Sequence, residues 1–305
     1  MTVIDSEIAS QPEVWATALA LTDRARSLFG PPGERVLAVG CGTSAFVAQS
    51  FAALREAAGA GETDAAFASE APVHRRYDRV VAFSRSGTTT EVLDLLGALA
   101  PGTVRVAVTA VDGMPVGRVV DEQLTLDFAD ETAVVQTRFP TATLALARAV
   151  YGHPVDDLIA AGRAALAAPL PVDPKRLGHV VFLGRGWTLG LAHEAALKLR
   201  EVARVTAESY PALDYRHGPI ALAGPGSLVC GIGDLPANLL ADVAALGAQV
   251  HAPGDDPLAA LVLAQRLAVA TARARGLDPD HPAHIVRSVV LPPAGPDSIL
   301  ARSAR

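Results

Sequence analysis

A short apolar strand that ends in a Gly-x-Gly turn and leads directly into a helix occurs twice in this chain. The first copy is residues 36–42 and the second is residues 180–186. Short apolar strands that alternate with helices are typical of a parallel sheet with helices on both faces. The interval between the copies is far too long for a solenoid repeat. The pattern therefore predicts two copies of one α/β unit.

The first half is predicted to start with a helical segment and to continue as alternating strands and helices. Ser10 as N-cap and Pro12 in the first turn predict a helix that runs toward Gly30. The sequence beyond it predicts strands at residues 35–40, 80–83, 104–109 and 123–126, and helices at residues 43–58 and 91–99.

A proline-rich stretch at residues 166–174 separates the halves. The second half is predicted to contain strands at residues 180–184, 227–231 and 248–251, a long helix at residues 258–275, and a final strand at residues 286–291. We therefore expect three parts: an N-terminal helical segment (1–30), a first α/β unit (31–165) and a second α/β unit (172–305).

Composition and charge argue against several classes of protein. Mean hydropathy is high at +0.30, but no run reaches the roughly 18 apolar residues of a membrane span. The N-terminus lacks the features of a secretory signal, and a net charge of −6 without a basic tract disfavours nucleic acid as a partner. Cys41 and Cys230 are too few for a disulfide framework. We expect a cytoplasmic protein that binds neither membranes nor nucleic acid.

The turn after the first strand, Gly40-Cys-Gly-Thr-Ser-Ala45, fits the G-x-G-x-x-A fingerprint of dinucleotide-binding folds. That fingerprint also needs an acidic residue about 20 positions later. Glu62 and Asp64 lie near that distance, but in a glycine-flanked stretch that does not resemble a strand end. A nucleotide site is therefore the weaker interpretation of a turn that presents helix N–H groups to an anion.

Hydroxyl groups gather where a buried strand meets its helix, in Ser84-Arg-Ser-Gly-Thr-Thr-Thr90. Amide donors and the helix dipole favour an anion at such a junction, and hydroxyls can surround a phosphate without a lysine or a metal. An N-cap alone is the alternative, but one Ser or Thr would suffice for it. Thr43 and Ser44, after the preceding strand, would close on the same phosphate. We predict a phosphate site without a metal or a cofactor.

A third group of residues lies on the helix after the second Gly-x-Gly turn. Glu194, Lys198 and Glu201 are spaced i, i+4 and i+7, so they share one helix face, and His217 follows in a later loop. Lys198 is one of only two lysines among 26 basic residues, which favours a specific role for it. The spacing leaves two interpretations open: a surface ion pair, or a proton-transfer site with a base, a cation and a histidine.

Together these motifs resemble the sugar isomerase (SIS) domain family, and in particular the isomerase half of the glutamine–fructose-6-phosphate transaminases. The resemblance covers most of the chain and rests on residues 7–12, 41–44, 84–89, 131–138, 182–186, 194–201, 207–210, 216–222 and 276–282. It implies a double SIS domain, that is, two tandem flavodoxin-like three-layer sandwiches with parallel sheets. It also implies a homodimer that binds a sugar phosphate.

The resemblance implies a role for each candidate site residue. The family holds its phosphate at the positions of five residues of this sequence: Ser44, Ser84, Arg85, Ser86 and Thr89. The position of Glu201 moves a proton between C1 and C2 of the open-chain sugar, and Lys198 lies beside it. The position of His217 assists ring opening from a neighbouring subunit. Further candidates for contact with the substrate are Val134, Glu194 and Arg287.

Three departures from the family pattern bear on the reaction. This sequence starts directly at the SIS region without a glutaminase domain, so we expect no ammonia supply from glutamine. Arg287 stands where the synthase has a Schiff-base lysine, and a guanidinium cannot form that imine. Arg85 and Thr88 replace a glutamine and a glutamate, which makes the phosphate loop more positive.

The sequence therefore predicts an enzyme that acts on a hexosamine or ketohexose 6-phosphate by C1/C2 proton transfer, as an isomerase or a deaminase. A non-catalytic phosphosugar-binding regulator is the alternative. Arg287 supports that alternative, whereas Glu201 and the absence of a DNA-binding helix-turn-helix in this sequence oppose it.

Overall fold

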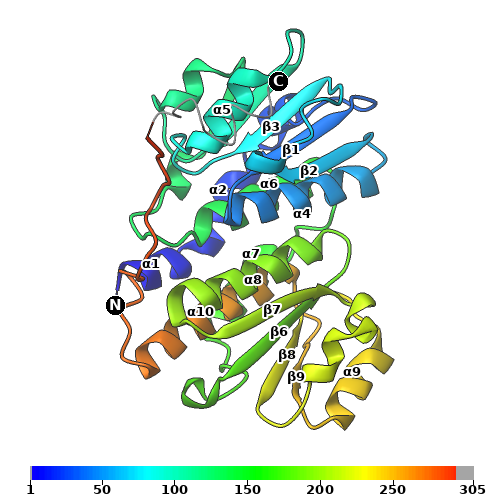
Figure 1. Ribbon diagram of the computed structural model, residues 1–305, viewed down its shortest axis with the longest axis vertical. Helices are drawn as coiled ribbons and strands as arrows, with labels where there is room; N and C mark the ends of the chain where they lie inside the picture. Colours follow the sequence, from blue (N-terminus) through cyan, green and yellow to red (C-terminus); the bar gives the residue numbers. More distant parts are fainter. Residues whose placement is uncertain (1, 293–305) are drawn as a thin grey trace.

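The computed structural model describes residues 2–292, which form two separate parallel sheets (Figure 1). The strand order of the first sheet is β2 (Thr63–Phe67), β1 (Val36–Gly40), β3 (Arg79–Phe83), β4 (Val104–Thr109) and β5 (Glu122–Thr125). The order of the second is β7 (Thr206–Pro211), β6 (His179–Gly184), β8 (Ser227–Gly231) and β9 (Gln249–His251). The predicted α/β class with parallel sheets is confirmed.

Helices cover both faces of each sheet (Figure 1). Between the sheets lie α4 (Thr43–Ala57), α6 (Arg138–Val150), α7 (Leu158–Ala167), α8 (Thr188–Ala203) and α10 (Pro257–Ala274). The outer faces carry α5 (Thr90–Ala98) on the first sheet and α9 (Ala237–Ala245) on the second. Within residues 2–292, no helix is both long and apolar enough to cross a membrane.

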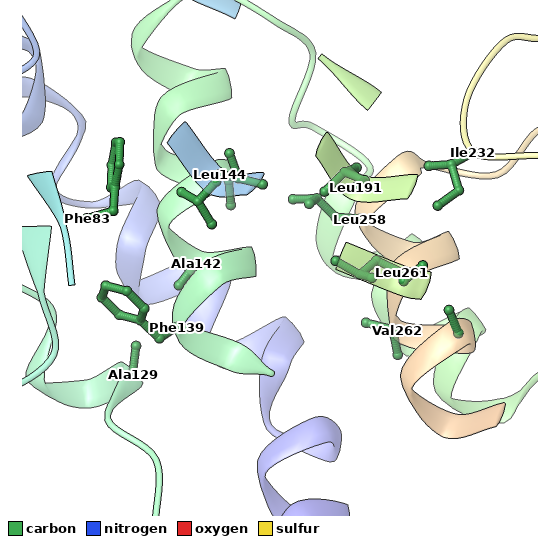
Figure 2. Packing of buried hydrophobic residues seen from close by; sticks show 14 of the residues in the cluster. Phe83, Ala129, Phe139, Ala142, Leu144, Leu191, Ile232, Leu258, Leu261 and Val262 are labelled. Carbon is green, nitrogen blue, oxygen red and sulfur yellow. The ribbon is translucent and has the colours of Figure 1, made fainter. Parts of the chain in front are cut away.

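One apolar core joins the two halves of the molecule. Its buried side chains come from the inner helices and the sheet faces beneath them, including Phe83 and Phe139 in the first half and Leu191 and Leu258 in the second (Figure 2). Two smaller clusters lie beneath α5 and α9 on the outer faces. Because apolar burial is the main stabilising term in folding, the halves are held against each other by packing and not by the chain connection alone.

The N-terminal segment consists of three short helices, α1 (Val3–Ala9), α2 (Gln11–Leu19) and α3 (Thr22–Leu28). The prediction of one helix from Ser10 toward Gly30 is therefore wrong. Pro12 does open α2, but the hydroxyl of Ser10 donates back to the Glu7 carbonyl at 2.8 Å and does not cap the helix. The segment bridges the halves, because the Trp15 ring N–H donates to Thr141 while the Ile4 N–H donates to Asp280.

The buried strands were predicted to within two residues, but β2 and β7 were missed. Both are edge strands with several partly or fully exposed residues, so neither forms a continuous apolar run. Continuous apolar runs mark strands that are covered on both faces, such as β1, β3 and β8. The edge strands β5 and β9 were nevertheless predicted to within one residue, so the lack of an apolar run, and not the edge position alone, explains why β2 and β7 were missed.

The final strand predicted at residues 286–291 is wrong. This segment joins neither sheet and lies along the loop that follows β3, where the Thr90 N–H donates to the Val289 carbonyl at 3.3 Å. Its valines and Leu291 imitate a strand pattern, yet their side chains are 46–67% exposed. The predicted second unit also includes residues 293–305, which lie outside the described part of the chain.

Candidate active site

The carboxyl edge of the first sheet brings two loops together. The turn after β1 leads into α4, and residues 84–89 after β3 lead into α5. Because β1 and β3 are parallel neighbours, both loops open at the same edge. Gly40 is required there, since a Cβ atom at this position would overlap the backbone of Ser44 in the first turn of α4. The glycine lets the helix start directly on the end of the strand.

Five of the six residues predicted to hold a phosphate line one small cavity between these loops. They are Ser44, Ser84, Arg85, Ser86 and Thr89, and the same cavity is lined by Cys41, Gln136 and Arg287. Within residues 2–292, the Ser84 hydroxyl and the Gln136 side-chain oxygen are buried without a hydrogen-bond partner. Buried polar atoms are normally paired, so the cavity is suited to a polar ligand.

The guanidinium of Arg85 is directed at main-chain carbonyls. It donates to Ala133 at 3.1 Å and to Arg287 at 2.7 Å, with a longer contact to the Val134 carbonyl at 3.4 Å. Burial lowers the pKa of Arg85 below its usual value, against the opposing effect of the nearby Glu131 carboxylate. Arg85 therefore joins the loop around Val134 to the C-terminal segment and contributes positive charge to the cavity wall.

A buried carboxylate fixes the loop that carries Gln136. Glu131 accepts hydrogen bonds from the Thr137 hydroxyl at 2.7 Å and from the Arg138 N–H at 2.8 Å, at the start of α6. Glu7, on α1, accepts from the N–H of Thr132 at 2.6 Å. The loop is thus held from both sides, and the Gln136 amide is held at the cavity. The site prediction missed Gln136, whose only sequence signal is its place in the motif 131–138.

Lys198 connects the second half to this edge of the first sheet. Its buried ammonium contacts Glu201 at 2.5 Å, Glu194 at 3.3 Å and the Thr43 hydroxyl at 3.2 Å. Thr43 lies at the start of α4, one residue before Ser44 of the hydroxyl-lined cavity. The structure therefore brings Glu194, Lys198 and Glu201 next to the predicted phosphate loops.

The three members of this cluster differ in environment. Burial raises the pKa of Glu194 to about 7, and Lys198 only partly offsets this effect. Burial by itself lowers the pKa of Lys198, but Glu194 and Glu201 outweigh it and the pKa lies above its usual value, so the ammonium remains charged. The Glu201 side chain is 21% exposed, against 2–3% for its two neighbours. Of the two carboxylates, that of Glu201 is therefore the more accessible from solvent.

Close packing of α4 against α8 sets this alignment. The Ser50 hydroxyl donates to the Trp187 carbonyl at 2.7 Å near the start of α8, while Lys198, near its end, reaches Thr43. The two helices therefore run antiparallel. Gly190 permits their close approach, because a Cβ atom there would overlap the Phe46 carbonyl and the Ser50 hydroxyl. As a result, the carboxyl edge of the first sheet faces the C-terminal end of α8.

His217 is not brought to this cluster within one chain. It is exposed and lies beyond the carboxyl end of β7, in the 3-10 turn Asp214–His217. Glu201 lies near the end of α8, just before β7 begins. A six-residue strand is about 20 Å long, so the two side chains lie at opposite ends of the second sheet.

A separate open groove of about 410 Å³ lies beside α4, between β2 and α8. The rings of Phe46 and Phe67 meet edge to face with centroids 6.1 Å apart, and His193 lies 5.3 Å from Phe46. Phe67 is 47% exposed in this groove. Its polar lining is limited to Gln49 and His193, which suits an apolar partner surface better than a sugar.

No protein-family model matches the chain. Among curated proteins, it is similar to glutamine–fructose-6-phosphate aminotransferase of Pyrobaculum aerophilum, with 32% identity over 70% of this chain and 44% of that protein. The enzyme of the same name from Sulfurisphaera tokodaii is 27% identical over 85% of this chain and 50% of its own length. The chain thus spans about half the length of these relatives.

Solved structures share the fold along nearly the whole chain. Glucosamine-6-phosphate deaminase of Thermotoga maritima superposes with a TM-score of 0.79 and 26% identity, covering 95% of this chain and all of that one. Tagatose-6-phosphate ketose/aldose isomerase of Escherichia coli superposes with a TM-score of 0.75 over 96% of this chain and 98% of that one, but at 20% identity it supports the fold alone.

The parallel sheets, the hydroxyl-rich loops and these similarities agree on one assignment. The chain is an SIS-type protein that resembles the isomerase module of glutamine–fructose-6-phosphate aminotransferase.

Proposed function

We propose that this protein is a sugar-phosphate isomerase or deaminase that acts on a hexosamine or ketohexose 6-phosphate. One observation carries the proposal: the Lys198 ammonium contacts both Glu201 and Thr43, so that a partly exposed carboxylate lies beside the hydroxyl-lined cavity. A phosphate held by Ser44, Ser84 and Thr89 would direct the rest of an open-chain sugar toward that carboxylate. The names of the related enzymes support the same class of substrate.

Glu201 is the proposed proton carrier. As a base it would remove the proton from C2 of an open-chain 2-amino aldose while O1 takes up a proton, giving an enolamine, and would then return its proton to C1 as the nitrogen gives one up. The resulting C2 imine would be hydrolysed by water to release ammonia and the ketose phosphate. For a substrate with a hydroxyl at C2, the same transfer interconverts aldose and ketose. Lys198 would hold the Glu201 carboxylate in place and stabilise negative charge that develops on the sugar oxygen.

Arg287 would not form an imine with the substrate, because its guanidinium stays protonated. It is also engaged, donating to Asp130 at 2.5 Å and to the Glu131 carbonyl at 2.9 Å. We propose that it shapes the cavity wall. The similarity to a glucosamine-6-phosphate deaminase favours deamination, which needs water and no protein-bound imine.

We further propose a double SIS arrangement, in which each sheet with its helices is one module (31–165 and 172–305) and residues 1–30 bridge them. The repeated strand–glycine–helix layout at Gly40 and Gly184 supports this division. The proposed substrate and the enzymes to which the chain is similar are consistent with a cytoplasmic location and with no nucleic-acid partner.

A homodimer would complete the proposed site. His217 and Glu201 lie at opposite ends of the second sheet, so one chain cannot use both on one substrate. Leu213 and Leu222, which flank His217, are 51% and 61% exposed. We propose that this loop docks on a second copy beside its Phe46–Phe67 groove and places His217 over the partner's sugar, where it would assist ring opening.

The test is incubation of the protein with glucosamine 6-phosphate and with fructose 6-phosphate, followed by measurement of ammonia, ketose and aldose. Ammonia release from the amino sugar establishes a deaminase, whereas aldose–ketose conversion without ammonia establishes an isomerase. A folded protein that binds these sugars but turns over none of them, including galactosamine 6-phosphate, would contradict both.

A non-catalytic phosphosugar-binding regulator is the second candidate, favoured by the arginine at position 287. It predicts binding of sugar phosphate without exchange of the C2 proton in deuterated water. Exchange that disappears in Glu201→Gln excludes it, because a regulator has no need to move that proton.

A further inference from the structure

The C-terminal segment 287–291 lies along the loop Ser84–Thr90, and polar contacts hold it there. Arg85 donates to the Arg287 carbonyl at 2.7 Å, and the Leu291 N–H donates to the Thr90 hydroxyl at 2.9 Å. Apolar burial does not account for this position, because the side chains of Val289, Val290 and Leu291 are 46–67% exposed. The contacts of this segment are with the predicted phosphate loop itself.

Ser288 places a hydroxyl in the middle of that loop. The Ser86 hydroxyl donates to Ser288 at 2.9 Å, and the Thr88 hydroxyl donates to Ser86 at 2.9 Å. Thr88 and Ser288 are 2.8 Å apart, and either one can donate. The three hydroxyls thus form a closed triangle in which each oxygen lies within hydrogen-bonding distance of the other two.

An anion bound by Ser86 would change the directions of the hydrogen bonds in this triangle. Each hydroxyl has one proton to donate and can accept two hydrogen bonds. A phosphate accepts only, so Ser86 can bind it only by turning its proton away from Ser288. Thr88 can then donate to Ser288 and Ser288 to Ser86, which gives an open chain that ends on the phosphate. The hydroxyls of Ser86 and Thr88 both keep hydrogen-bond partners, and Ser288 still holds segment 287–291 on the loop.

We propose that Ser288 is a positioning residue of the phosphate site, which holds Ser86 in orientation and polarises its O–H toward the anion. This inference rests on the proposed function, since it assigns Ser288 to that same site. A donor that itself accepts a hydrogen bond is strengthened, and a fixed rotamer costs less to order on binding. The described contacts of Ser288 are to Ser86 and Thr88, so its effect on substrate would pass through them.

Isothermal titration with inorganic phosphate and with fructose 6-phosphate tests this role. Ser288→Ala is expected to weaken binding of both ligands about 5- to 10-fold, corresponding to the loss of about one hydrogen bond. In turnover assays KM should rise by a similar factor while kcat changes less than 2-fold. Ser288→Thr keeps the hydroxyl and should restore most of the affinity. Val290→Ala, on the same segment but 67% exposed, is the matched control and should bind normally.

The outcomes separate this inference from the proposed function. If wild-type protein binds neither ligand, the result contradicts the proposed function as well as the role of Ser288. Wild-type binding with unchanged affinity in Ser288→Ala overturns only the role of Ser288. Tighter binding by Ser288→Ala also overturns it, because the C-terminal segment would then compete with phosphate. Equal losses in Ser288→Ala and Ser288→Thr would show that packing matters and not the hydroxyl.

Discussion

The two Gly-x-Gly turns have the same geometry and different chemistry. Gly40 and Gly184 each end a central strand, and a Cβ atom on either would overlap the backbone four residues later, at Ser44 or Thr188. Ser44 lines the cavity, whereas the Thr188 hydroxyl contacts the Arg185 N–H at 2.9 Å and the Ile232 carbonyl at 2.9 Å. The turn geometry is therefore needed for folding in both halves, and only the neighbouring side chains make one of them a candidate binding site.

The second loop of each half sharpens the contrast. After β3 the chain continues with Ser84-Arg-Ser-Gly-Thr-Thr89, whereas after β8 it continues with Ile232-Gly-Asp-Leu-Pro236. The second sequence has no hydroxyl and carries an exposed carboxylate, Asp234, which would repel a phosphate. The second half instead supplies ionisable groups from the far end of α8. We infer that the first half holds the anion and the second half performs the chemistry.

The largest effect is expected from Glu201→Gln. Removing the proposed base should lower kcat by at least about 1,000-fold, a typical scale for the loss of a general base together with its orientation, while titration still detects sugar-phosphate binding. Asp234→Asn removes a carboxylate from the carboxyl edge of the same half and should leave turnover unchanged. Equal losses in both variants would show that this contrast within the second half is wrong.

Mixing two inactive variants tests whether opposite ends of the second sheet meet across a dimer. Glu201→Gln and His217→Ala should each be nearly inactive with cyclic substrate. After unfolding and refolding together, half of the dimers should be mixed, each with one intact site of two, so activity should recover to about a quarter of wild type. No recovery, in a mixture shown to contain mixed dimers by mass spectrometry, would place both residues in one chain's site or in none.

Substitutions at the equivalent turn positions compare the halves directly. Ser44→Ala should raise KM about 10-fold by removing a phosphate donor, with little change in thermal unfolding. Thr188→Val should leave KM unchanged but lower stability by about 1–3 kcal/mol, since it leaves the buried carbonyl of Ile232 and the Arg185 N–H without this partner. Kinetics and thermal unfolding of both variants check this. A raised KM in Thr188→Val together with a loss of stability in Ser44→Ala would contradict the assignment.

Much of the fold could be predicted because the interior strands are continuous apolar runs. That Ser44 and the loop after β3 line one cavity could be predicted, because parallel strands place the ends of β1 and β3 at one edge. The contacts of the Arg85 guanidinium could not be predicted, because whether it faces an anion or the Val134 carbonyl depends on where a loop distant in sequence lies. The position of residues 286–291 could not be predicted either. Their sequence has a strand-like pattern, but polar contacts hold them on a loop about 200 residues away.

The last expected effect is a pH dependence of stability, which should come from the second half. Hydroxyls at the first edge do not titrate near neutral pH, whereas burial raises the pKa of Glu194 from 4.5 to about 7. The folded protein keeps this proton where the unfolded chain has lost it. The stabilising contribution is therefore complete below pH 4.5 and decreases as pH rises to about 7, by up to about 3 kcal/mol.

Glu194→Gln removes this titration without removing the side chain's volume. The unfolding free energy of wild type minus that of Glu194→Gln, measured by urea denaturation, should therefore decrease from pH 5 to pH 7. It should stay constant above pH 8. Glu122→Gln, at an exposed position on β5, is the control and should give a difference that does not vary over this range. Parallel curves for wild type and Glu194→Gln would mean that Lys198 keeps Glu194 ionised throughout this range. Glu194 and Lys198 would then form a permanent ion pair that positions Glu201, and Glu194 would hold no proton near neutral pH.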